Sequence, residues 1–149
     1  MTKKENLILE YTILAGIVIT FLFIIFQIKT GDIDLCRAIF KDLVNGRYGV
    51  QKYIDWGSFQ GLDINVGETY AKLSTEKEKT GYKKVFIQSF SRGFKGAGGE
   101  FRSFINWRIY NHDSHQVVVA ADYRGRNKTL LLILSSEGKK KLISLQWKK

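Results

Sequence analysis

The sequence predicts an α+β protein with one N-terminal transmembrane helix, followed by about three helices packed on a curved four-stranded antiparallel sheet. Three observations lead to this fold class. An uncharged apolar run lies near the N-terminus, apolar residues with helical spacing follow it, and from residue 101 onward apolar and polar residues alternate. We therefore divide the chain into a tail and anchor, residues 1–31, and an extracytoplasmic domain, residues 32–149.

The composition restricts the classes of protein to which the chain can belong. It has 149 residues, 44% of them hydrophobic, which is enough for one compact core and argues against a disordered chain. Its 24 Lys and Arg against 14 Asp and Glu give a formal net charge of +10. The single cysteine, Cys36, excludes an intramolecular disulfide and a multi-cysteine zinc site, and we expect no cofactor and no metal.

The N-terminal apolar run covers residues 11–28 and contains no charged residue. A helix of this length is roughly 27 Å long, close to the thickness of a bilayer's hydrocarbon core. No A-x-A-like cleavage site follows it, so the pattern favours an uncleaved signal anchor over a signal peptide. Lys3 and Lys4 precede the run and Lys29 follows it, so the positive charges on its two sides are nearly balanced. They favour one membrane orientation of the helix only weakly. We expect a single-pass membrane protein with a cytoplasmic N-terminus; the alternative is a helix buried in a globular core.

Helical periodicity continues after the anchor. Asp34 is predicted to cap a helix that ends at Asn45-Gly46, with an apolar face made of Leu35, Cys36, Ile39, Phe40, Leu43 and Val44. A short second helix is expected over residues 47–56, and another short helical segment near residues 68–73.

The clearest helix begins after Thr75, which forms a capping box with Glu78. Aromatic residues then recur at every fourth position, at Tyr82, Phe86, Phe90 and Phe94. Such a stripe is typical of a helix face packed on a core. The helix is expected to end in the glycines of residues 96–99, which lack the Lys-Ser/Thr ending of a phosphate-binding loop.

The last third of the chain predicts four strands joined by tight turns, over residues 101–110, 116–123, 128–134 and 140–147. Strands that follow one another through short turns form an antiparallel meander. The run 129–134 is the most apolar, so we expect it at the centre of the sheet.

Two short segments resemble a known superfamily. Phe40–Tyr48 is similar to the opening of the nuclear transport factor 2-like (cystatin-like) superfamily, in which a helix, a glycine and an aromatic residue lead to a second helix. Lys141–Trp147 is similar to its last strand. The resemblance covers roughly residues 34–147 and implies helices packed into the concave face of a curved sheet. Separately, residues 73–78 and 82–90 resemble a helix of bacterial envelope phospholipid-shuttle proteins of the toluene-tolerance type.

Two groups of residues are candidates for binding. An apolar pocket between the third helix and the sheet would be lined by Tyr82, Phe86, Phe90, Phe94, Trp107 and Trp147, and would suit a lipid-like molecule; the alternative is a closed core. A basic surface would consist of Arg124, Arg126, Lys128, Lys139, Lys140 and Lys141. That surface would attract an anionic membrane, a cell-wall polymer or an acidic partner, whereas nucleic acid is not expected.

Catalytic candidates are few. His112 and His115 flank Asp113 in a predicted turn and could bind a metal, although turn histidines are mostly solvated. Asp55 and Asp63, near Trp56 and Phe59, are the only acids in an apolar setting and could act as a catalytic base, but we favour positions at a helix terminus and in a turn. We therefore expect no catalytic residue and no enzyme activity.

Together these features predict a membrane-anchored, non-catalytic binding or scaffold module of the cell envelope, docking protein partners or an apolar ligand. One alternative is a structural subunit of a surface or secretion assembly. Another is a small pocket enzyme of the same fold. The expected partners are the membrane itself, an envelope protein complex, and a lipid or anionic surface.

Overall fold

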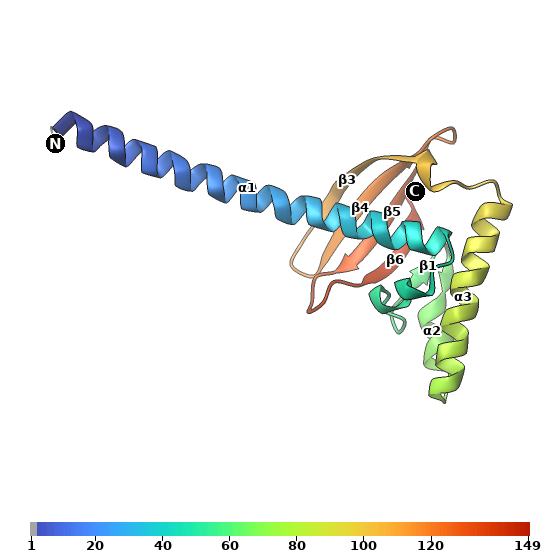
Figure 1. Cartoon of the computed structure of the whole chain (residues 1–149). Coiled ribbons are helices and arrows are strands. Elements are labelled where there is room, and N and C mark those ends of the chain that lie inside the picture. The colour runs from blue at the N-terminus through green and yellow to red at the C-terminus, as the bar shows by residue number, and fades with distance from the viewer. Residues whose placement is uncertain (1–2) are drawn as a thin grey trace. The chain divides into compact units, whose positions relative to one another are not determined.

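The computed structural model describes the backbone of residues 3–149 and the side chains of residues 11–25 and 31–149. The chain divides into two compact units, Met1–Gly31 and Asp32–Lys149. Helix α1 spans Lys3–Val44 without interruption, so the prediction that a separate helix starts at Asp34 is wrong (Figure 1). Gly46, at φ 67°, terminates the helix in the left-handed conformation that the Asn-Gly pair predicted.

The predicted transmembrane helix over residues 11–28 is also wrong. Among the side chains that the structure describes, no helix is long and apolar enough to cross a membrane. The side chains of residues 26–28, the end of the predicted span, lie outside the described part.

The sheet has six strands in the order β2-β1-β6-β5-β4-β3, in place of the four predicted. All neighbours pair antiparallel except β1 and β6, which pair parallel, so the sheet is mixed. The two additional strands are too short to show an alternating sequence pattern. The strands are β1 Gln60–Gly61, β2 Ile64–Asn65, β3 Phe104–His112, β4 Gln116–Tyr123, β5 Lys128–Ser135 and β6 Leu142–Trp147.

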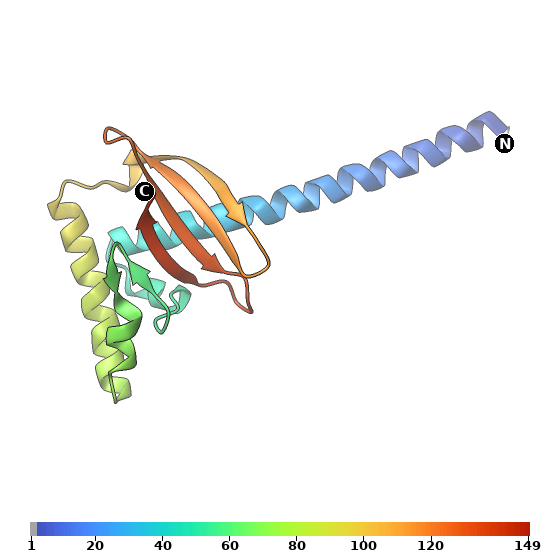
Figure 2. The same ribbon diagram turned by 180° about the vertical axis from the view of Figure 1, so that it is seen from behind.

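In sequence, the remaining helices lie between α1 and strand β3. Helices α2, Val66–Ala71, and α3, Glu76–Gly96, lie side by side in both views (Figures 1 and 2). The Thr75 hydroxyl accepts the backbone N–H of Glu78, and the Glu78 carboxylate accepts that of Thr75, which confirms the capping box. The predicted second helix is only a 3₁₀ turn, Tyr48–Tyr53, because the chain becomes extended at Ile54 and bridges to β6.

The main hydrophobic core lies within the unit Asp32–Lys149, which also contains a smaller buried cluster of Val118, Ala120 and Leu131. Strand β5 pairs on one side with β4 and on the other with β6, as its apolar sequence predicted. Phe40 of α1 is 2% exposed and its ring contacts those of Phe94, Phe101, Phe104 and Trp107. The core contains alternate residues of the central strands and the last turns of α1: Cys36, Ile39, Phe40, Leu43, Val117, Val119, Leu130, Leu132 and Leu134.

A charged pair joins α1 to the connection between β5 and β6. Asp32 is 5% exposed, and its carboxylate is hydrogen-bonded and ion-paired to the Lys140 ammonium. Cys36 lies one turn further along the helix and is fully buried. Burial, and secondly the negative charge of Asp32, raise the pKa of the Cys36 thiol well above its ordinary value. Cys36 is therefore a protonated core residue, not a reactive thiolate.

Candidate functional site

The six residues predicted to line an apolar pocket belong to one continuous row of aromatic rings. Along α3, the ring of Phe86 lies 6.1 Å from that of Phe90, which stacks 6.4 Å from Phe94. Tyr82 joins the same row through Trp56, whose ring lies 6.5 Å from Tyr82 and 5.7 Å from Phe86. Side chains spaced in this way pack against one another, as aromatic core residues do.

The sheet side of the row consists of Trp107 and Trp147. The Trp107 indole N–H donates a hydrogen bond of 3.0 Å to the Phe104 carbonyl, so its polar atom is satisfied within the protein. The Trp147 ring stacks 6.3 Å from that of Phe104. Near the C-terminal end of α3, Phe94 lines a depression of about 420 Å³ together with Phe101, Lys95 and Arg102.

The predicted basic residues lie in two separate places, at opposite ends of β5. Arg124, Arg126 and Lys128 lie at the turn from β4 to β5. Lys139, Lys140 and Lys141 lie in the connection from β5 to β6, and there Lys140 is occupied by its pair with Asp32. The sequence predicted a single basic surface because both clusters flank the same strand.

Lys148 does not belong to the first group: its backbone N–H donates 2.8 Å to the carbonyl of Thr129, but its ammonium lies 4.9 Å from the centre of the Tyr110 ring of β3. We call Arg124, Arg126 and Lys128 the basic end. All three are exposed, and in the described part of the chain none of them has a carboxylate partner. The Lys128 ammonium lies 5.7 Å from the centre of the Trp147 ring, a cation–π contact that holds it near the turn.

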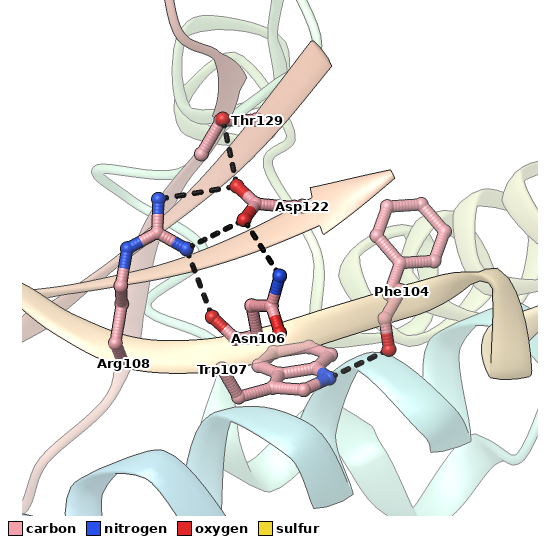
Figure 3. A network of polar contacts seen from close by, with 6 residues as sticks. All are labelled: Phe104, Asn106, Trp107, Arg108, Asp122 and Thr129. Carbon is pink, nitrogen blue, oxygen red and sulfur yellow. Dashed lines mark hydrogen bonds and ion pairs between the residues drawn. The ribbon is translucent and has the colours of Figure 1, made fainter. Parts of the chain in front are cut away.

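The carboxylate closest to the basic end is already neutralised (Figure 3). Asp122 accepts two hydrogen bonds from the Arg108 guanidinium, of 3.0 and 3.1 Å, one at each oxygen. The Thr129 hydroxyl donates 3.0 Å to one oxygen, and the Asn106 amide donates 3.3 Å to the other. These bonds, that of Arg108 first, lower the pKa of Asp122 below its ordinary value.

A depression of about 460 Å³ lies at this turn, and we call it the hairpin depression. Its lining consists of Ile105, Asp122, Tyr123, Arg124, Gly125, Asn127, Lys128 and Thr129. Gly125, at φ 91°, and Asn127, at φ 45°, give the turn the left-handed backbone that these two residue types tolerate. Since the Asp122 charge is compensated by Arg108, the two remaining cations, Arg124 and Lys128, set the electrostatic sign of the depression.

Sequence reasoning identified the cations of this turn and missed the polar network beneath them. Asp122 and Thr129 are direct partners across the β4–β5 ladder, a pairing that the sequence analysis did not predict. Arg108 lies on the neighbouring strand, where a register shift between Ile105 and Arg108 displaces the side chains. Such an irregularity has no counterpart in the alternating sequence pattern.

The catalytic candidates Asp113 and His115 interact with neighbouring backbone groups and with an exposed carboxylate. The Asp113 carboxylate accepts the backbone N–H groups of His115 (2.7 Å) and Gln116 (2.8 Å), and these bonds lower its pKa. His115 Nδ1 lies 3.1 Å from an exposed carboxylate oxygen of Glu137. Among the described residues, no three His, Cys, Asp or Glu side chains are placed to hold a metal ion.

The two other acids, Asp55 and Asp63, lie in different segments. Asp63 is exposed, at φ 73°, in the turn between β1 and β2. Asp55 precedes β1, and its backbone carbonyl accepts the N–H of Ser58.

Comparison with protein-family models, with curated proteins and with solved structures gives no match.

Proposed function

We propose that the unit Asp32–Lys149 is a non-catalytic binding module that docks an acidic segment of a partner protein through the basic end. The proposal is carried by one observation: Arg124, Arg126 and Lys128 gather at one end of the sheet without a carboxylate partner in the part of the chain that the structure describes. Two nearby carboxylates are occupied, Asp122 by Arg108 and Glu100 by Arg102. The positive field of this end is therefore available to a partner.

Charge complementarity and side-chain polarity favour an acidic protein over a lipid surface. Proteins that bind lipid interfaces insert apolar side chains between the headgroups. The turn from Arg124 to Asn127 has only polar or charged side chains and a glycine. The large hydrophobic side chains exposed in this unit lie in other segments, at Tyr48, Ile64, Val85 and Tyr110.

A non-catalytic role is supported by how the titratable groups are used. The Asp122 carboxylate is saturated with donors, Asp113 closes a turn, and the Cys36 thiol is buried and protonated. None of the three combines the exposure and the unused proton-transfer capacity that a catalytic base or nucleophile requires.

The architecture supports a superfamily proposal as well. Helices packed on a six-stranded, mostly antiparallel sheet are compatible with a nuclear transport factor 2-like fold. We infer that residues 34–147 form a member of that superfamily, on the resemblance of Phe40–Tyr48 and Lys141–Trp147 to its first helices and last strand. An experimental structure whose sheet did not curve around the helices would contradict this assignment.

The docking proposal is tested with the full chain and fluorescent poly-L-glutamate as the acidic probe, by anisotropy at several salt concentrations. We expect saturable binding that weakens as salt screens the charges. The triple variant R124Q/R126Q/K128Q should weaken it at least tenfold. The matched control K77Q/K139Q/K141Q removes three exposed cations from other places and should retain binding within about threefold.

Two results would overturn the proposal. One is equal loss of binding in both triple variants, which would mean that net charge alone attracts the probe. The other is binding to anionic phospholipid vesicles with no binding to poly-L-glutamate, which would assign the basic end to a membrane surface.

A further inference from the structure

We propose that the hairpin depression is a subsite for a phosphate group, carried either by a phosphorylated side chain of the acidic partner or by free inorganic phosphate. This inference rests on the proposed function, because it assigns a particular anion to one part of the basic end. The observation behind it is the lining of the depression, a space of about 460 Å³ to which both Arg124 and Lys128 contribute.

The donors of the lining suit a phosphate group. A guanidinium has a planar set of N–H donors that matches two phosphate oxygens, and Arg124 belongs to the lining. Lys128, also in the lining, adds a second full charge, with its ammonium 5.7 Å from the centre of the Trp147 ring. Asn127 supplies an amide from the same turn. A phosphate monoester carries between one and two negative charges near pH 7, so two cations compensate it, whereas a single carboxylate needs only one.

The Asp122 network removes the main obstacle to anion binding. An uncompensated carboxylate in the lining would repel phosphate. Here four donors from Arg108, Asn106 and Thr129 surround the carboxylate, which also fixes its orientation (Figure 3). Thr129 is thereby a positioning residue, because its hydroxyl proton is directed to Asp122 and not to the depression.

Arg126 is the internal control that the turn provides. It lies two residues from Arg124 on the same turn and is exposed, yet it is absent from the lining of the depression. A diffuse electrostatic attraction acts on Arg124 and Arg126 alike, whereas a phosphate subsite in the depression depends on Arg124 and not on Arg126. R124Q and R126Q change the net charge equally, so they separate the two explanations.

The first experiment is calorimetric titration of the full chain with inorganic phosphate at constant ionic strength set by chloride. We expect saturable binding to wild type, a loss of at least tenfold in R124Q, a several-fold loss in K128Q, and a change below twofold in R126Q. Circular dichroism of each variant confirms that the exposed substitutions leave the fold intact. Equal small effects of R124Q and R126Q, or no saturable heat with wild type, would overturn the inference.

The second experiment distinguishes the sources of the phosphate group. An acidic peptide with one phosphoserine is compared with the same peptide carrying Glu at that position, each with and without competing inorganic phosphate. A preference of tenfold or more for the phosphopeptide, lost in R124Q, assigns the subsite to a phosphorylated partner. Binding of inorganic phosphate without that preference assigns it to the free ion. Equal binding of both peptides by every variant, with no competition by phosphate, would overturn the inference and leave the docking proposal standing.

Discussion

At the scale of single residues, Asp122 shows how a partly exposed carboxylate can couple stability to pH. The hydrogen bonds from Arg108 hold the folded-state pKa of Asp122 below its usual value, which is about 3.9 in an unfolded chain. The unfolded state therefore binds the proton more tightly. The stabilisation from Asp122 is fully present above about pH 4 and is lost as the pH falls through the folded-state pKa.

We predict that D122N has a smaller loss of stability on acidification than wild type. The measurement is the urea midpoint of each protein at neutral pH and at about pH 3. D34N is the control, because Asp34 is exposed and has no hydrogen-bond or ion-pair partner among the side chains described, and it should retain the wild-type dependence on pH. A steeper acid loss in D122N would show that Arg108 does not stabilise the Asp122 carboxylate.

At the scale of elements, two helical glycines should respond in opposite directions to alanine. A Cβ added to Gly67, in α2, would lie 2.5 Å from the Gly57 carbonyl oxygen, so the chain around it would have to move. G67A should therefore destabilise the protein by about 1–3 kcal/mol. Gly81, inside α3, has nothing within 4 Å of an added Cβ, so G81A should stabilise it by about 0.5–1 kcal/mol.

Denaturant unfolding of the two variants checks both signs in one series. If G67A were neutral, the close approach of α2 to the residue 57 backbone would be absent in solution. If G81A were destabilising, the exposed face of α3 near Gly81 would be covered by something that the added methyl group displaces.

The elements that could be predicted from sequence are those whose signal is local and long. Helix α3 has a capping box and a repeating aromatic stripe, and strands β4 and β5 alternate or are apolar over eight residues each. The strands β1 and β2 could not be predicted, because they depend on pairing with β6 and with each other and not on their own residues. The start predicted at Asp34 failed because a capping residue also fits within a continuous helix.

The candidate site was predictable only in part, for the same reason. The sequence identified Arg124, Arg126 and Lys128 as cations of one turn, since neighbours in sequence remain neighbours in space. It could not separate them from Lys139–Lys141, because the length of β5 between the two groups places them apart. Neither could it show that Lys140 is paired with Asp32, a contact between residues 108 positions apart.

At the scale of the whole molecule, the residues that make up the hydrophobic core all lie within the unit Asp32–Lys149. We therefore predict that residues 32–149 fold without the preceding segment. The expected result is a cooperative urea transition and dispersed amide signals in an NMR spectrum. A broad, non-cooperative transition would mean that the core depends on the first turns of α1.

A core substitution in residues 32–149 tests whether the shortened chain keeps the same hydrophobic core. Phe40 is 2% exposed and touches four other aromatic rings, so F40A should lower the free energy of unfolding by about 3–5 kcal/mol. V85A, at a side chain that is 61% exposed, is the matched control and should change it by less than about 0.5 kcal/mol.

The burial of the lone thiol has a kinetic consequence. Since Cys36 is fully enclosed and its thiol is protonated, a thiol reagent such as a disulfide dye reacts with it only after the last turns of α1 have separated from the sheet. In the absence of urea, the labelling rate therefore reports how often this part of the helix detaches. We expect K140Q to accelerate labelling by removing the partner of Asp32, and K141Q, on the adjacent exposed side chain, to leave the rate unchanged. Equal rates in all three proteins would mean that the helix detaches without breaking the Asp32–Lys140 pair.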